Sequence, residues 1–173
     1  MAGEPGTGRG TAGRVVVGVD GSAGARAALR FAAEDAVRRG VPLEAVAAYR
    51  PPEAWMDFYA IGEYEPDRAR TAAEEQARRH VDEVLGELTG PAPDVRVTAV
   101  QGAAADVLVD ASTGADLLVV GSRGHGGFSS VLLGSVGMHC VLHASCPVTV
   151  VHSAEAHGTR IRLRRQHGRE PVS

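Results

Sequence analysis

The sequence predicts an α/β protein, a single doubly wound domain in which helices cover both faces of a parallel β-sheet. Apolar runs alternate with segments of helical periodicity in the pattern β-α-β-α-β-α-β-α-β. Two of these runs, "RVVVGVD" at 14–20 and "DLLVVG" at 116–121, show no polar alternation, which is typical of strands buried on both faces. Strands joined by such helical crossovers lie parallel.

Length and charge limit the classes of function. The 173 residues fit one domain with a core of ordinary size, which we place at 14–153. The net charge of −3 does not favour a specific nucleic-acid partner. No stretch approaches the roughly 20 apolar residues of a membrane span, and the N-terminal residues lack the apolar centre of a signal peptide. We therefore expect a cytoplasmic protein that does not bind a membrane.

Two segments outside this domain are expected to lack fixed structure. Residues 1–13 contain five glycines and almost no large apolar side chain, which predicts a flexible arm. Residues 154–173 include the arginine-rich stretch "RIRLRRQHGR" and predict a solvated basic tail, with weak contact to a nucleic acid or an acidic surface as the alternative.

The helices and strands follow from periodicity and from residues that begin or end helices. Ser22 is placed to cap a helix whose inner face carries Ala25, Ala28, Leu29, Ala32 and Ala36, and Gly40 ends it. The alternation in "DVRVTAVQG" at 94–102 predicts an edge strand or a strand with one wetter face. The other expected elements are strands at 42–49 and 146–151 and helices at 67–88, 104–112 and 135–143.

A long loop at 50–66 holds most of the aromatic side chains of the chain. An apolar plug over the sheet is one interpretation. A lid over a ligand or a surface for a partner protein is the other.

The segment "GSRGHGGFSSVLLGSV" at 121–136 holds five glycines and four serines. Connections between adjacent elements usually need about 2–6 residues, whereas this one uses roughly a dozen. A glycine loop between a buried strand and a helix can point its backbone N–H groups at a phosphate, and the helix N-terminus adds partial positive charge. We expect the amides of Gly134 and Ser135 and the Ser135 hydroxyl to be free for that anion, with Arg123 and His125 as further donors.

Ligands of open parallel sheets bind beyond the carboxyl ends of the strands, which here are Val19–Asp20, Ala47–Ala48 and 121–127. Asp20 at such an end could bind a ribose or an adenine, or it could serve the turn alone. The loop lacks the lysine of a Walker A motif, and "VGVDGSAG" lacks the glycine spacing of a dinucleotide fold.

Gly121, Gly124, Gly134 and Ser135 match the glycine spacing of the ATP-binding universal stress proteins, and the chain resembles that family over roughly 14–152. "VVVGVDGS" is similar to the family's first strand and turn, and "HASCPVTVVH" to its closing strand. The resemblance implies a five-stranded sheet of order 3-2-1-4-5 and a homodimer formed through the last strand, 147–152. Ala47 departs from the family, because many members carry histidine there.

The resemblance also assigns roles to residues of a site for ATP. Asp20 and the backbone around Val19 and Ala48 would hold adenine and ribose, and Gly121 would let the ribose approach. The residues around the phosphates would be Gly124, His125, Gly134, Ser135 and Val136, with Arg123 as a helper.

The function that follows is an ATP-binding regulatory protein of the stress response, acting through a nucleotide-dependent dimer. One alternative is slow ATP hydrolysis with Mg or Mn bridging phosphate oxygens, although we identify no catalytic residue that could activate the water. Others are a nucleotide-free interaction scaffold and a flavin carrier. His139, Cys140, His143 and Cys146 invite a metal site, but packed or surface side chains explain them more simply, and we expect the thiols to be reduced.

Overall fold

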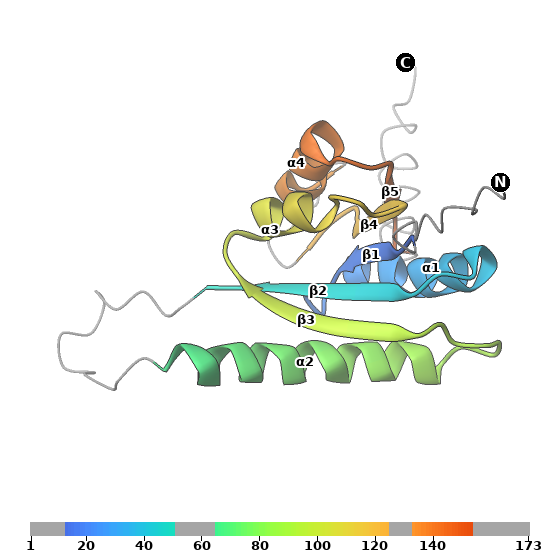
Figure 1. The fold of residues 1–173 in the computed structure, drawn as a ribbon, viewed down its shortest axis with the longest axis horizontal. Coiled ribbons are helices and arrows are strands. Elements are labelled where there is room, and N and C mark those ends of the chain that lie inside the picture. The colour runs from blue at the N-terminus through green and yellow to red at the C-terminus, as the bar shows by residue number, and fades with distance from the viewer. Residues whose placement is uncertain (1–12, 51–64, 125–132, 154–173) are drawn as a thin grey trace, which may run out of the picture.

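The structure is a computed structural model that describes residues 13–50, 65–124 and 133–153 (Figure 1). The strands are β1 (Val15–Gly18), β2 (Leu43–Tyr49), β3 (Val95–Gln101), β4 (Leu117–Gly121) and β5 (Val148–Val151). The helices are α1 (Ala23–Arg39), α2 (Pro66–Gly86), α3 (Ala104–Ala111) and α4 (Ser135–His143). Within the described residues the strands form one parallel sheet in the order β3-β2-β1-β4-β5.

This order confirms the predicted fold class. The strand with alternating residues, β3, lies at one edge of the sheet, and β1 lies at its centre. Differences from the predicted elements are confined to their ends. The last strand begins at Val148 instead of Cys146, because the intervening Pro147 has no N–H to add to the ladder. The second helix covers Pro66–Gly86 instead of 67–88.

Helices cover both faces of the sheet, so the core has two parts. Val15 and Val17 of β1 face one part, which also contains Leu29 of α1 and Val84 of α2. Val16 faces the other part, which is built with α3 and α4; Figure 1 shows these two helices together on one side of the sheet. Burying each of these valine or leucine side chains contributes about 1.5–3 kcal/mol. The apolar runs without polar alternation therefore belong to strands with two buried faces.

The two ends of α1 are fixed by a serine at its start and a glycine at its end. Ser22 is the N-cap of α1, and its hydroxyl accepts a hydrogen bond from the Ala25 amide at 3.2 Å, as predicted. The helix ends at Gly40, whose φ of 67° is left-handed. The five residues predicted for the inner face of this helix are all buried. The Ser22 cap thus determines where α1 begins after the carboxyl end of β1, and Gly40 determines where it ends.

Several predictions concern segments outside the described ranges. Residues 1–12 of the predicted arm at 1–13, residues 51–64 of the aromatic loop at 50–66 and the basic tail at 154–173 lie there, and these stay predictions. None of the helices in the described ranges combines the length and the apolar character that a membrane span requires.

Candidate functional site

A cavity of about 680 Å³ lies at the carboxyl ends of β1, β2 and β4. Its volume falls in the range of small-molecule sites, roughly 300–1,000 Å³. The chain leaves β1 through α1 toward β2 and returns through α3 to β4 on the other side of β1. The crossovers therefore diverge between β1 and β4, which is where open parallel sheets bind ligands.

The structure brings most of the predicted site residues to this one cavity. Nine of the ten line it, namely Val19, Asp20, Ala48, Gly121, Arg123, Gly124, Gly134, Ser135 and Val136. The tenth, His125, lies outside the described residues. Residues far apart in sequence thus meet at the edge of the sheet that the pattern indicated.

The Asp20 carboxylate connects the first turn with the loop after β4. Its Oδ1 accepts a hydrogen bond from the Ser22 amide at 2.9 Å, so Asp20 has the turn role considered from the sequence. Its other oxygen, Oδ2, lies over Gly124, where an added Cβ would be only 2.7 Å away. Asp20 also lines the cavity, so it has a place both in the turn and in the candidate site.

The N-terminus of α1 packs directly against the end of β4. A Cβ on Gly121 would lie 2.5 Å from the Gly24 carbonyl carbon, and a Cβ on Gly24 would lie 2.2 Å from the Arg123 carbonyl oxygen. Two backbone segments therefore touch with no room for side chains. The predicted reason for Gly121 was the approach of a ribose; the structure shows that the contact with α1 by itself requires glycine.

The start of α4 supplies amide donors, with one correction to the prediction. The Gly134 amide is not free for an anion, because it donates to the Ser122 carbonyl at 2.8 Å. This bond joins the two ends of the glycine loop. The following amides, of Ser135, Val136 and Gly137, belong to the first turn, where no carbonyl of the same helix can accept from them. The donors thus begin one residue later than predicted.

The cavity has an apolar wall that the sequence did not reveal. Val46, Leu108 and Val120 line it and are each at most 5% exposed. Ala104 at the start of α3 also lines it. The predicted topology could have indicated Ala104, since a helix that follows a parallel strand begins at the carboxyl edge of the sheet. Such a wall suits the face of a flat aromatic group, and Arg123 is the only cationic side chain among the described lining residues.

The histidines and cysteines at 139–146, which invited a metal site, lie in separate environments. Cys140 is buried and Cys146 half-buried, both are free thiols, and burial raises the pKa of each. His139 Nε2 lies 3.5 Å from Asp106 Oδ1, and the rings of His139 and His143 are 4.4 Å apart between centroids. Among the described residues no group of three or more His, Cys, Asp or Glu side chains could hold a metal ion.

The fold and the cavity define a class of protein, a doubly wound α/β domain with a ligand cavity at the carboxyl ends of its central strands. Comparison with known families then gives the particular one. A model described as "Universal stress protein family" matches residues 11–152, and the chain belongs to this family.

Individual relatives agree with this membership. The universal stress protein Rv2623 of Mycobacterium tuberculosis is 36% identical over 146 residues, which cover 82% of this chain and 48% of that protein. The chain thus spans about half the length of this curated relative. A crystal structure of a universal stress protein in complex with cAMP has a TM-score of 0.57 and 28% identity, covering 83% of this chain and 98% of that one.

A further solved structure supports the fold alone. The universal stress protein UspA from Lactobacillus plantarum has a TM-score of 0.60 at 23% identity and covers 80% of this chain and 97% of its own. The sheet order and the parallel strands of this chain match that fold.

Proposed function

We propose that the cavity binds an adenine nucleotide, with ATP as the ligand that the glycine spacing favours. The observation that carries the proposal is the meeting of three strand ends and the start of α4 around one cavity. The apolar wall would receive the base, and Asp20 would accept hydrogen bonds from the ribose or the base. The solved relative with cAMP, at 28% identity, supports an adenine nucleotide as the class of ligand.

The phosphates would lie between the two ends of the glycine loop. On one side are the amides of Ser135 and Val136 and the Ser135 hydroxyl, on the other the backbone at Gly124. Arg123 would supply the positive charge that a phosphate requires. Mg or Mn, where present, would be held through phosphate oxygens of the nucleotide.

The regulatory part of the proposal is a cytoplasmic homodimer formed through the last strand. Its support is that β5 ends the sheet, so its outer edge has no partner strand among the described residues. Beside this edge, α4 exposes Met138, Val141 and Leu142, which are 47%, 48% and 67% exposed. Met138 also lines the cavity, so a bound nucleotide and the partner would contact the same helix.

The test begins with the ligand that the protein carries. Small molecules released from freshly purified, denatured protein are identified by mass spectrometry, and an adenine nucleotide near one per chain is the expected result. Purified protein is then incubated with ATP while phosphate release is followed. A flat trace with ATP still bound removes the hydrolase alternative, and the absence of both nucleotide and an ATP-induced thermal shift supports the scaffold instead. A yellow protein that releases a flavin would favour the flavin carrier.

A further inference from the structure

His80 of α2 packs against the turn between β1 and α1 without lining the cavity. A Cβ added to Gly21 would lie 2.4 Å from His80 Cε1 and 2.8 Å from Nε2. Gly21 has a φ of 79°, a left-handed conformation that favours glycine. The half-buried imidazole therefore lies directly on the main chain at Gly21.

The same turn faces the cavity on its other side. Asp20 and Ser22 line the cavity, whereas Gly21 between them does not. The Asp20 carboxylate is held by the Ser22 amide, and the Ser22 hydroxyl in turn accepts from the Ala25 amide. A shift of Gly21 toward the space occupied by His80 would move both cavity-lining neighbours. The position of Asp20 consequently depends on the His80 side chain that packs against Gly21.

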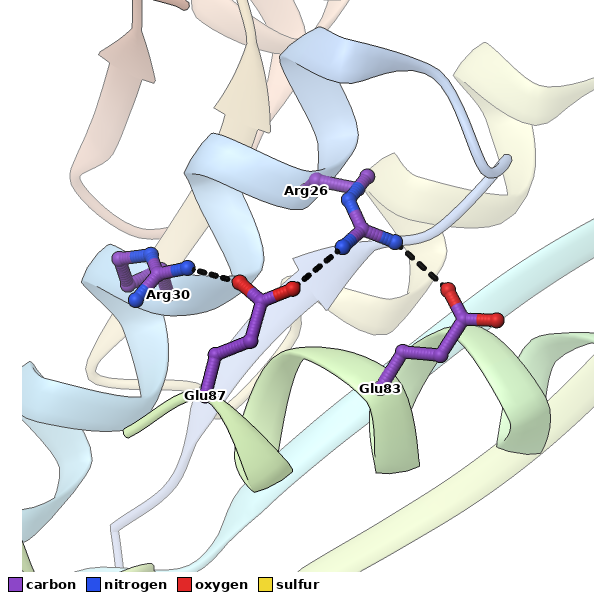
Figure 2. Close-up of polar contacts among 4 residues, drawn as sticks. All are labelled: Arg26, Arg30, Glu83 and Glu87. Carbon is purple, nitrogen blue, oxygen red and sulfur yellow. Dashed lines mark hydrogen bonds and ion pairs between the residues drawn. The ribbon is translucent and has the colours of Figure 1, made fainter. Parts of the chain in front are cut away.

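An ion-pair cluster of Arg26, Arg30, Glu83 and Glu87 joins α1 to the end of α2 close to this contact (Figure 2). Arg26 donates to Glu83 at 2.6 Å and to Glu87 at 2.9 Å, and Arg30 also donates to Glu87. Glu83 lies about one helical turn after His80, and Arg26 about one turn after Ser22. The cluster thus links α1 and α2 close to the point where His80 meets the turn.

We propose that His80 is a positioning residue for the cavity. Its ring holds the turn of Asp20, Gly21 and Ser22 in the conformation that presents Asp20 to a ligand. The effect on affinity rests on the proposed function, the binding of an adenine nucleotide. The role of His80 in holding the turn does not depend on that function. His80 reaches the ligand only through the turn, since it does not line the cavity.

Calorimetric titration of ATP into the full chain tests this role. His80→Ala should raise the Kd about tenfold, because the turn loses its support and Asp20 is no longer preorganised. His80→Phe, which restores a flat ring, should return the Kd to within about threefold of wild type. Arg79→Ala, at the exposed neighbouring position on α2, is the matched control and should bind as wild type does. Thermal melts establish that each variant is folded.

A wild-type Kd for His80→Ala would overturn the proposal. A Kd for His80→Phe as weak as that of His80→Ala would also overturn it, because packing of the ring would then not be the cause.

Hydrogen exchange in the absence of ligand separates this inference from the proposed function. The Ser22 and Ala25 amides, which are bonded within the turn, should exchange faster in His80→Ala than in Arg79→Ala. If the wild-type protein binds no nucleotide, the proposed function fails, and faster exchange still supports the positioning role. Unchanged exchange at both amides contradicts it, whatever the affinities.

Discussion

At the residue scale, the contact between Gly124 and Asp20 leaves no room for a Cβ, and it gives the first prediction. In Gly124→Ala the new methyl would lie 2.7 Å from Asp20 Oδ2, so the carboxylate must shift from the position in which its Oδ1 accepts from the Ser22 amide. We expect the Kd for ATP to rise at least about tenfold, or ~1.4 kcal/mol, in a protein that still folds. Calorimetry measures the Kd.

The matched control is Gly90→Ala, because nothing lies within 4 Å of a Cβ at that glycine. This variant should bind ATP as wild type does. If the Kd for ATP rose equally in both variants, or rose in neither, the contact between Gly124 and Asp20 would not shape the site.

Asp35 gives a prediction about pH at the same scale. Burial opposes ionisation of this carboxyl, but hydrogen bonds and positive charge from Arg39 and Arg38 outweigh it and hold the pKa of Asp35 below its ordinary value. Because the unfolded pKa is the higher one, about 3.9, ionised Asp35 stabilises the protein above that pH. This stability is lost as the pH falls through the folded pKa.

Asp35→Asn should therefore lower the free energy of unfolding by about 1 kcal/mol at neutral pH. The difference from wild type should shrink as the pH is lowered from about 5 to about 2. Urea unfolding at several pH values measures it. A difference that stays constant over that range would mean that the charge of Asp35 does not stabilise the fold.

At the scale of elements, the packing of α2 on the sheet and on α1 involves both apolar burial and exposed ion pairs, and their magnitudes differ. Val84 is 1% exposed in the core shared with α1, whereas the side chains of Arg26 and Glu87 are 36% and 49% exposed. Exposed pairs contribute about 0–1 kcal/mol and are screened by salt. Burial of Val84 should consequently contribute more.

We expect Val84→Ala to cost about 2 kcal/mol of unfolding free energy, through lost burial and the cavity left behind. Glu87→Gln should cost less than about 1 kcal/mol, and less still in high salt. Urea unfolding at low and high salt measures both. If Glu87→Gln cost more unfolding free energy than Val84→Ala, ion pairs would stabilise the packing of α2 more than apolar burial does.

The exposed apolar face of α4 gives a second prediction at this scale. If the proposed homodimer forms through β5 with α4 beside it, Leu142→Glu introduces a charge at a position that is 67% exposed in the single chain. Two such charges would face the same interface, so the dimer should dissociate. Light scattering after size exclusion gives the mass of wild type and variant. A wild-type monomer, or a variant dimer as tight as wild type, would contradict the proposed interface.

At the scale of the whole molecule, the sequence predicted the sheet because its central strands are apolar on both faces. Val15 to Val17 and Leu117 to Val120 show the buried pattern on adjacent residues, and α1, which follows the first of these strands, has clear caps at Ser22 and Gly40. Strand ends then predicted which segments meet at the cavity. The strand ends indicated only 19–20, 47–48 and 121–127, whereas the full set of nine site residues came from the resemblance to the universal stress proteins.

What the sequence could not predict depends on contacts between distant residues. The Gly134 amide bonds to Ser122, and this closure of the loop has no local signal. Leu108 enters the cavity wall through the packing of α3 over β1 and β2, and His80 meets Gly21 only because α2 lies beside α1. Each contact requires the tertiary arrangement. Short-range patterns determine the elements and leave these contacts open.

Calorimetric titration of ATP into the wild-type chain and into Asp20→Ala tests the central claim, a nucleotide site at the carboxyl ends of β1, β2 and β4. The account predicts saturable binding with one site per wild-type chain and a Kd at least about tenfold higher in a folded Asp20→Ala protein. No heat of binding and no thermal shift with ATP, AMP or cAMP in the wild type, or equal affinity in the two proteins, would contradict it.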